Sequence, residues 1–196
     1  VDPRIGRMIL ASVDEGCLPQ MLIIASALEV QDPRERPLEK QEAADARHAQ
    51  FADEQSDFLS YLKLWDFYHK LKSQLSRNQL QKACRQNFLS FMRIREWLDV
   101  HRELLELVDE AGLKGAAQGN SAAARSASRR PRSRQGHPRG PRGREQPEQQ
   151  TYDAIHRAIL TGLLSSVAVR AEAHDYSVAG GGKAKLWPGS GIFRDR

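Results

Sequence analysis

The feature that most constrains this fold is a long segment that offers almost nothing to a hydrophobic core. Residues 115–150 contain no Val, Leu, Ile, Met or aromatic residue and consist mainly of Gly, Ala, Ser, Pro, Gln and Arg. Such a segment buries too little apolar surface to offset the conformational entropy lost on ordering. We therefore expect a disordered insertion here, so the folded core must come from residues 1–114 and 151–196.

The insertion also carries the positive charge of the chain. It holds eight arginines and two glutamates, a net +6, whereas the whole chain has a net charge of +5, so the other residues sum to −1. An Arg-rich strand attracts phosphate groups without reading their sequence. A solvated linker is the simpler interpretation, since closing a loop of this length costs only about 3 kcal/mol. We favour the linker and regard weak nucleic-acid affinity as secondary.

The residues before the insertion carry the signals of a series of helices. Asp2 followed by Pro3 is typical of an N-cap with proline at the first helical position. Ser76 and Gln79 have the spacing of a capping box, which predicts a new helix at that point. The expected helices are 3–16, 18–30, 39–51, 58–75, a helix from 76 towards 112 that continues or bends after 91, and, beyond the insertion, 152–164.

Apolar residues at helical spacing indicate which faces are buried. In the first helix, Ile5, Ile9, Leu10 and Val13 are assigned to one face. The clearest stripe lies at 58–75 and consists of Phe58, Tyr61, Leu62, Trp65, Tyr68, Leu71 and Leu75.

The last thirty residues change to short alternating segments. Residues 167–169, 176–178 and 183–187 read as short antiparallel strands, with glycines 180–182 between two of them. The predicted fold class is therefore mainly α, a helical bundle with a disordered insertion, followed by a few β-strands.

The composition argues against several classes of protein. No apolar run reaches the roughly 18 to 20 residues that span a bilayer, and no basic and then apolar leader opens the chain. The two cysteines, 67 positions apart, have neither a disulfide framework nor a metal-ligand spacing, which suits a reducing compartment. The chain begins at Val1 and not at Met, so we expect it to be part of a longer protein.

No catalytic set is visible. Glycines 180–182 before Lys183 do not form a phosphate loop, because Ala184 stands where Ser or Thr is required. Residues 171–174 (Ala-Glu-Ala-His) match the metal-binding box of a helicase motor at three of four places but lack its acidic ligand, so we regard the match as coincidence. The histidines show no i, i+4 pair, and Cys84 is assigned to the core. The sequence predicts no catalytic, cofactor or metal site in these residues.

What remains is binding. The helix expected after Ser76 carries scattered cations, namely Lys82, Arg85, Arg93, Arg95 and Arg102. A basic helix with aromatic neighbours is compatible with contacts to a nucleic-acid backbone. From spacing alone, interleaved Glu96, Glu103 and Glu106 favour an ion-paired solvent face instead. Trp65, Phe91 and Trp97 also have two interpretations. They could stack on bases or pack in the core, and aromatic residues at helical spacing more often pack in the core.

The order of several segments resembles the accessory region of DEAH-box RNA helicases. Residues 1–10 (VDPRIGRMIL) resemble the end of the winged-helix domain of that family. Seven short segments resemble parts of the helicase-associated ratchet domain of that family. They are GCL at 16–18, IIASAL at 23–28, QDPRERP at 31–37, SDFL at 56–59, NFL at 87–89, RIREW at 93–97 and IHRAILTGLL at 155–164. Residues 176–191 resemble the start of the following OB-fold. Among these helicases the chain is most similar to the bacterial HrpA type.

The resemblance implies a division of the chain into parts. These are 1–16 (end of the winged-helix domain), 17–114 (helical ratchet domain), 115–150 (disordered insertion), 151–165 (closing helix of the ratchet domain) and 166–196 (start of the OB-fold). Three departures stand out. The insertion is foreign to the family pattern, Gly180 replaces the arginine of a Gly-Ala-Arg-Gly turn, and Ala184 replaces the usual Phe.

The resemblance implies that this region lines the RNA channel of an ATP-dependent helicase. ATP and Mg²⁺ would bind in upstream RecA-like domains outside these residues. The partners implied are single-stranded RNA, bound without sequence specificity, and the RecA-like, winged-helix and OB-fold domains of the same protein. A cytoplasmic location follows, with no membrane contact.

The implied RNA-binding residues are Arg93, Arg95, Arg102, Lys183 and Lys185, each of which also fits a surface ion pair or a solvated charge. The alternative is a non-catalytic helical adaptor. In that case the aromatic stripe at 58–75 would dock a helix of a protein partner, and the basic insertion would be its only RNA-binding element.

Overall fold

The computed structural model describes residues 2–113, 147–172, 175–179, 181–187 and 190–193. Most of the predicted insertion lies outside these ranges, and residues 147–150 belong to a helix. The chain forms two compact units. The first contains Val1–Met21 and Glu106–Leu164, and the second contains Leu22–Leu105 and Ser165–Arg196.

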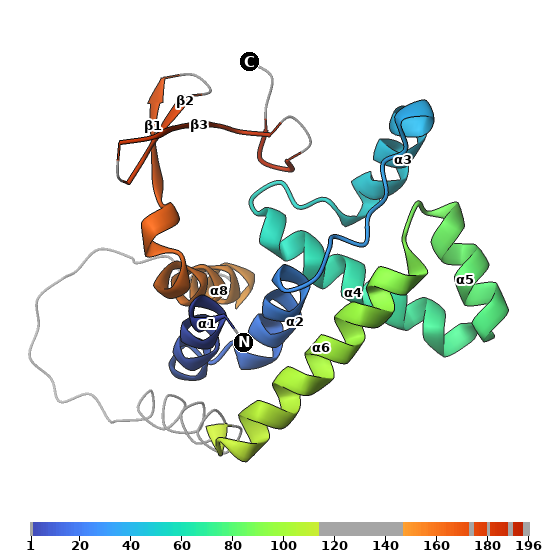
Figure 1. Ribbon diagram of the computed structural model, residues 1–196, viewed down its shortest axis with the longest axis horizontal. Coiled ribbons are helices and arrows are strands. Elements are labelled where there is room, and N and C mark those ends of the chain that lie inside the picture. The colour runs from blue at the N-terminus through green and yellow to red at the C-terminus, as the bar shows by residue number, and fades with distance from the viewer. Residues whose placement is uncertain (1, 114–146, 173–174, 180, 188–189, 194–196) are drawn as a thin grey trace, which may run out of the picture. The chain divides into compact units, whose positions relative to one another are not determined.

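The predicted fold class, mainly α with β-strands near the end, is confirmed (Figure 1). The α-helices are α1 (Pro3–Asp14), α2 (Leu18–Leu28), α3 (Gln41–His48), α4 (Asp57–Gln74), α5 (Arg77–Gln86), α6 (Phe91–Glu110) and α8 (Pro147–Gly162). Short 3₁₀ turns occur at Leu38–Lys40, Ala49–Phe51 and Leu164–Ser166. None of the described helices has the length and apolar character needed to cross a membrane.

In the first unit, α1 and α8 pack against each other (Figure 1). The predicted N-cap is present, since the Arg4 backbone N–H donates to Asp2 Oδ1 at 2.8 Å. Gly162 of α8 lies so close to α1 that a Cβ there would meet the carbonyl oxygen of Arg4 and the side chain of Met8. The absence of a side chain at this position therefore sets the distance between the two helices.

The face assigned to α1 from sequence is wrong for one residue. Ile5, Ile9 and Val13 are buried, but Leu10 is 56% exposed. At about 100° per residue, Leu10 lies about 140° around the helix from Ile5. Met8 and Ser12 complete the buried face instead.

The core of the second unit is built around Trp97 of α6. This side chain is 1% exposed, and its Nε1–H donates to Ser26 Oγ at 2.9 Å and to the Ile23 carbonyl oxygen at 3.1 Å, both in α2. The other buried members of the cluster come from four helices and their connections: Ala27, Phe51, Leu64, Tyr68, Leu80, Cys84, Leu89 and Ile94. The core assignments of Trp97 and Cys84 are thus confirmed.

The expected helix after Ser76 bends, and it does so before residue 91. α5 ends at Gln86, Phe88 has a positive φ of 51°, and α6 begins at Phe91. The turn pairs with the segment after α2 through two backbone hydrogen bonds, Glu35 N to Phe88 O at 2.8 Å and Ser90 N to Pro33 O at 2.8 Å. This pairing determines where α6 begins.

The strands form one antiparallel sheet in the order β1 (Ala168–Glu172), β2 (Asp175–Val178) and β3 (Lys183–Lys185). The register places Ala168 opposite Val178 and Asp175 opposite Lys185. After β3 the chain contacts the first turn of α4, where the Gly191 N–H donates to Asp57 Oδ1 at 2.8 Å and the Ser190 hydroxyl donates to Oδ2. The predicted strands are confirmed.

Candidate nucleic-acid interface

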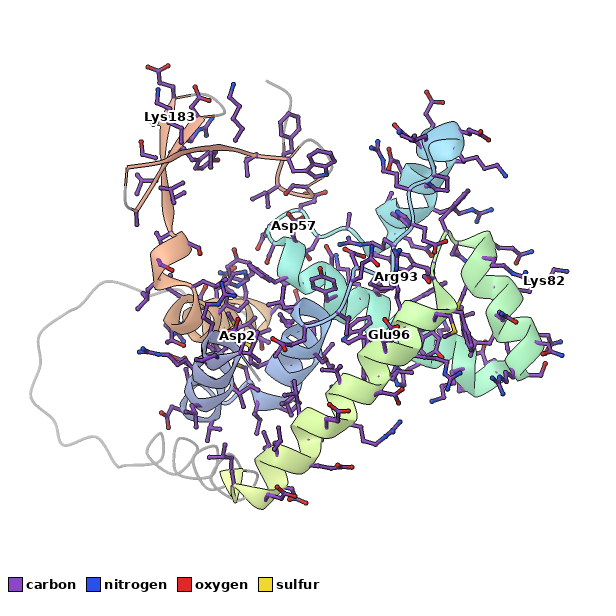
Figure 2. The ribbon with its side chains drawn as sticks, in the orientation of Figure 1. Asp2, Asp57, Lys82, Arg93, Glu96 and Lys183 are labelled. Atoms are coloured by element: carbon purple, nitrogen blue, oxygen red, sulfur yellow. The ribbon has the colours of Figure 1, made fainter. Side chains whose placement is uncertain are left out.

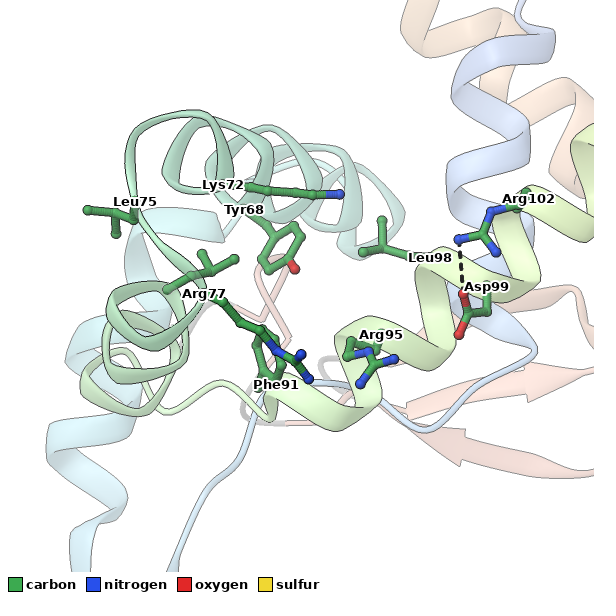
Figure 3. Close-up of a pocket in the computed structure, with 10 residues that line it drawn as sticks. Tyr68, Lys72, Leu75, Arg77, Phe91, Arg95, Leu98, Asp99 and Arg102 are labelled. Atoms are coloured by element: carbon green, nitrogen blue, oxygen red, sulfur yellow. Dashed lines mark hydrogen bonds and ion pairs between the residues drawn. The ribbon is translucent and has the colours of Figure 1, made fainter.

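A cavity of about 350 Å³ opens between α4, α5 and α6 of the second unit, and we call it the α4–α5–α6 pocket (Figure 3). Its rim carries the charged residues Lys72, Arg77, Arg95, Asp99 and Arg102. The rest of its lining is apolar and aromatic, from Tyr68, Leu75, Leu80, Phe91 and Leu98. The pocket therefore combines several cations with an apolar floor.

The sharp connection between α4 and α5 creates this hollow. Leu75 ends α4 in an extended conformation, with φ −117° and ψ 145°. The Ser76 backbone N–H then donates to Gln79 Oε1 at 3.0 Å, which is the Gln half of the predicted capping box. Arg77 is the first residue of α5, and the buried Leu80 anchors that helix one turn later. The capping sequence thus places Arg77 across the pocket from α6.

The charges at the rim are only partly neutralised. Arg102 pairs with Asp99 at 3.0 Å, within α6. Lys72, Arg77 and Arg95 have exposed side chains, and no carboxylate of the described residues lies within 4.0 Å of their nitrogens. The rim consequently presents uncompensated positive charge to solvent.

Tyr68 supplies a polar group at the floor of the pocket. Its side chain is 4% exposed, and its hydroxyl is directed into the pocket (Figure 3). Among the residues that the structure describes, the hydroxyl has no hydrogen-bond partner. Burial raises the pKa of Tyr68, helped by the nearby Cys84 and opposed by the charge of Arg95. The phenol is therefore protonated at neutral pH and available as a donor.

Of the five residues predicted to bind RNA, the pocket brings Arg95 and Arg102 together. They are seven positions apart on α6, so they lie on the same side of the helix, about 20° apart.

Arg93 lies elsewhere. Two positions from Arg95, it is about 200° around the helix (Arg93 is labelled in Figure 2). Its Nη1 donates to the Asp32 carbonyl oxygen at 3.1 Å. Asp32 is itself bound by Arg34, whose Nη2 lies 2.6 Å from Asp32 Oδ2. The half-buried Arg93 therefore joins α6 to the segment after α2.

Lys183 and Lys185 lie on β3, and both are exposed. Lys185 faces Asp175 across the sheet, with 3.6 Å between Nζ and the carboxylate. Lys183 is opposite Ser177. The glycine at 180, where the family pattern has arginine, lies outside the described residues.

Sequence reasoning missed Lys72, Arg77 and Tyr68 as members of one site. A signal did exist, since Tyr68 and Lys72 are one helical turn apart and Arg77 follows the capping serine. The angle between α4 and α5 does not follow from the spacing of residues along the chain. The sequence therefore could not predict that Arg77 and Arg95 line the same pocket.

The aromatic residues for which base stacking and core packing were both open, Trp65, Phe91 and Trp97, mostly pack against other side chains of the chain. The ring of Trp65 lies between two histidines, with centroid distances of 4.4 Å to His69 and 4.5 Å to His101. Burial lowers the pKa of His101, and the neighbouring His69 lowers it further. Phe91 is the one of the three candidates that lines the pocket.

Within the described ranges, no group of three His, Cys, Asp or Glu side chains could hold a metal ion. Cys84 is completely buried, and burial raises its pKa to about 11. A thiol in this environment stays protonated and unreactive at neutral pH.

Comparison with known proteins places the chain among helicases. Residues 2–61 match the family described as "Helicase associated domain (HA2), ratchet-like". The chain is 36% identical over 195 residues to the ATP-dependent RNA helicase HrpA of Escherichia coli (strain K12), covering 99% of this chain and 13% of that protein. It is 37% identical, with the same coverages, to the HrpA homolog of Haemophilus influenzae.

A eukaryotic relative is more distant. The pre-mRNA-splicing factor ATP-dependent RNA helicase prp22 of Schizosaccharomyces pombe is 31% identical over 109 residues, which is 56% of this chain and 9% of that protein. The bacterial similarity spans both compact units, in agreement with the resemblance noted in the sequence. Almost the whole chain is thus similar to one region of the HrpA-type ATP-dependent RNA helicases, and this region makes up about 13% of their length.

Proposed function

We propose that this chain is an accessory region of an ATP-dependent RNA helicase, and that it grips single-stranded RNA while motor domains elsewhere in the protein hydrolyse ATP and drive unwinding. The observation that carries the proposal is the similarity of 99% of the chain to RNA helicases. The match includes a ratchet-like helicase-associated domain.

The geometry of α6 supports a grip on the RNA backbone. Arg95 and Arg102 stand on one side of the helix, at the rim of the α4–α5–α6 pocket. Arginine binds phosphate oxygens through parallel N–H donors, which holds a strand without reading its bases. Burial of Trp97 on the opposite side of α6 fixes the helix against its own core. A rigid helix with exposed arginines can hold successive nucleotides without adapting to their sequence.

The sheet forms a second element of the proposed channel. We interpret β1–β3 as the beginning of an OB-fold, a fold whose strands commonly bind single strands. Lys183 would add phosphate contact there, and Lys185 would do so in competition with Asp175.

The remaining parts of the proposal concern the whole protein. ATP and Mg²⁺ would bind in RecA-like domains outside these 196 residues, and those domains, with the winged-helix and OB-fold domains, would be the intramolecular partners. The protein would act in the cytoplasm.

The adaptor alternative receives less support from the structure. Its docking surface, the aromatic stripe of α4, is largely occupied by the chain itself. Tyr68 belongs to the core cluster, and Tyr61, Trp65, Leu71 and Leu75 pack against it. A partner helix would find little of the stripe available.

Charge reversal at the rim tests the proposed function. In the full-length protein, Arg95→Glu with Arg102→Glu should raise the RNA concentration for half-maximal stimulation of ATP turnover about tenfold, because two phosphate contacts become repulsive. Lys82→Glu with Arg85→Glu changes the charge equally on exposed positions of α5 outside the pocket, and it should shift that concentration less than twofold. Equal shifts in both variants would reject the rim as the contact surface.

Deletion of residues 115–150 separates the two candidate functions. The helicase interpretation predicts that the shortened protein keeps salt-sensitive RNA binding through its folded part. Complete loss of RNA affinity on deletion would support the adaptor instead.

A further inference from the structure

We propose that the α4–α5–α6 pocket is a binding site for one nucleotide unit of single-stranded RNA, with its phosphate held by Lys72, Arg77 and Arg95 and hydrogen-bonded by the Tyr68 hydroxyl. This inference rests on the proposed function and deepens it. It assigns a bounded site to residues of α4 and α5 that the helicase resemblance did not indicate.

The first argument is the convergence of charge. Three cations from three different helices line one cavity, and none of them has a carboxylate partner among the described residues. Arg102 is paired with Asp99, whereas Lys72, Arg77 and Arg95 face the same cavity without such a pair. Their mutual repulsion falls when an anion occupies the space between them.

The second argument is the Tyr68 hydroxyl. The Tyr68 side chain is almost completely buried, lines the cavity and has no protein partner for its hydroxyl in the described part of the chain. The hydroxyl oxygen itself remains accessible from the pocket. Its O–H is therefore available to donate to a water or a ligand there. A phosphate oxygen placed between Arg77 and Arg95 supplies such an acceptor.

The third argument is size and lining. A volume of about 350 Å³ is at the lower end of the roughly 300 to 1,000 Å³ typical of small-ligand sites. It suits one nucleotide unit and is too small for a helix. Phe91 and Leu98 give the base or ribose an apolar contact beside the cationic rim.

The chemistry of the rim favours RNA over another class of polyanion, an acidic peptide. Two arginines facing one space match the several oxygens and diffuse charge of a phosphodiester. The aromatic floor matches a planar base. The basic insertion of this chain is excluded as the occupant, because its net charge of +6 is repelled by the same cations.

The test compares two pairs of substitutions with the same change of charge. The probe is a fluorescein-labelled 12-residue oligouridylate, and its binding to the full-length protein is followed by fluorescence anisotropy over a KCl series. Lys72→Gln with Arg77→Gln should raise Kd at least tenfold. It should also lower the slope of log Kd against log [KCl] by about 0.7, the value for one phosphate contact on a single strand. Lys82→Gln with Arg85→Gln, on exposed α5 positions outside the pocket (Lys82 in Figure 2), should raise Kd less than threefold.

Tyr68→Phe provides a second readout that does not depend on charge. It removes only an oxygen that bonds to no described protein group, so the fold and the thermal transition should be retained. Kd should rise about five- to tenfold, as expected for a lost hydrogen bond to a charged group. An unchanged Kd for Tyr68→Phe would overturn the assignment of the hydroxyl to a bound phosphate.

The remaining outcomes are distinct from one another. If the Lys72 and Arg77 pair behaves like its control, the pocket is not the site, while RNA binding by the protein stands. If oligoglutamate of matched charge displaces the probe as well as unlabelled oligouridylate does, the pocket selects carboxylates and the nucleotide assignment is wrong. If the unmodified protein fails to bind the probe, the proposed function fails as well.

Discussion

The indole Nε1–H of Trp97 donates a hydrogen bond to the hydroxyl oxygen of Ser26, with 2.9 Å between the two atoms. The Ser26 hydroxyl in turn donates to the Leu22 carbonyl oxygen at 2.7 Å. This chain of bonds joins α6 to α2 inside the core, and both side chains are almost completely buried. The position of α6, and with it the arginine-bearing side, therefore depends on a polar contact between two helices.

We expect Trp97→Phe to lower the free energy of unfolding by about 2 to 3 kcal/mol, through a lost hydrogen bond and a cavity beside Trp65. Ser26→Ala is the matched control, since it removes the acceptor Oγ but leaves the indole bonded to the Ile23 carbonyl oxygen. It should cost about 1 kcal/mol. Urea unfolding, followed by far-ultraviolet circular dichroism of the helices, measures the free energy of unfolding of both variants. Equal effects would mean that the indole volume contributes nothing.

Two glycines on facing helices should respond oppositely to the same substitution. Gly162→Ala places a methyl group against the Arg4 carbonyl and Met8, so it should destabilise the first unit by roughly 1 to 3 kcal/mol. Gly6→Ala in α1 meets nothing within 4 Å and should stabilise by up to about 1 kcal/mol, because alanine is the better helix former. Differential scanning calorimetry of both variants checks the sign. If Gly162→Ala raised the free energy of unfolding, α1 and α8 would have to be farther apart than the contact of Gly162 with Arg4 and Met8 implies.

The Asp32–Arg34 pair should make stability depend on pH at the acidic end. Burial alone raises the pKa of the Asp32 carboxyl, but the hydrogen bonds and charge of Arg34 lower it more, so the pKa lies below its usual value. A depressed folded-state pKa contributes stability above the unfolded value, near 4, that is lost as the pH falls through the folded value. Asp32 is partly exposed, so the contribution is about 1 kcal/mol.

Arg34→Gln should therefore lower the free energy of unfolding at pH 7 and have little effect below about pH 3. Urea titrations from pH 7 to pH 3 test this. Arg36→Gln, which breaks an exposed pair with Asp45, is the control and should have the smaller effect at pH 7. A difference that grows on acidification would contradict the assigned direction of the Asp32 pKa.

Both cysteines should be hidden from thiol reagents in the folded chain. Burial raises the pKa of Cys17 to about 11, with Glu15 adding to the shift, and burial raises that of Cys84 to about 11. At pH 8 such a thiol is only about 0.1% thiolate. Labelling with a disulfide reagent should be slow until urea unfolds the chain, and then both thiols should react. Rapid labelling of Cys84 alone would mean that α5 opens locally.

The elements were predictable where a short-range signal determines them. Asp2 with Pro3 and Ser76 with Gln79 mark helix starts, because the caps satisfy backbone N–H groups within one turn. Alternating residues after 166 predicted the strands for a similar local reason. The division of the chain into the five family parts was not tested by these observations and stays a prediction.

The candidate site was predictable only in part. The angular spacing along α6 groups Arg95 with Arg102 and separates Arg93, and this grouping can be read from the sequence. The pocket itself depends on the angles at which α4, α5 and α6 meet, and these follow from the packing of Trp97, Leu80 and Leu89 in the core. Such long-range contacts have no signature in the spacing of residues.

The pairing of Phe88 with Glu35 has a mechanical consequence. Two backbone hydrogen bonds, together with the His48 Nε2 contact to the Phe88 carbonyl oxygen at 3.1 Å, clamp the start of α6 to the segment 33–35. The first turn of α6 is therefore attached to a segment far from it in the sequence as well as to α5, so the α6 wall of the pocket has a support of its own.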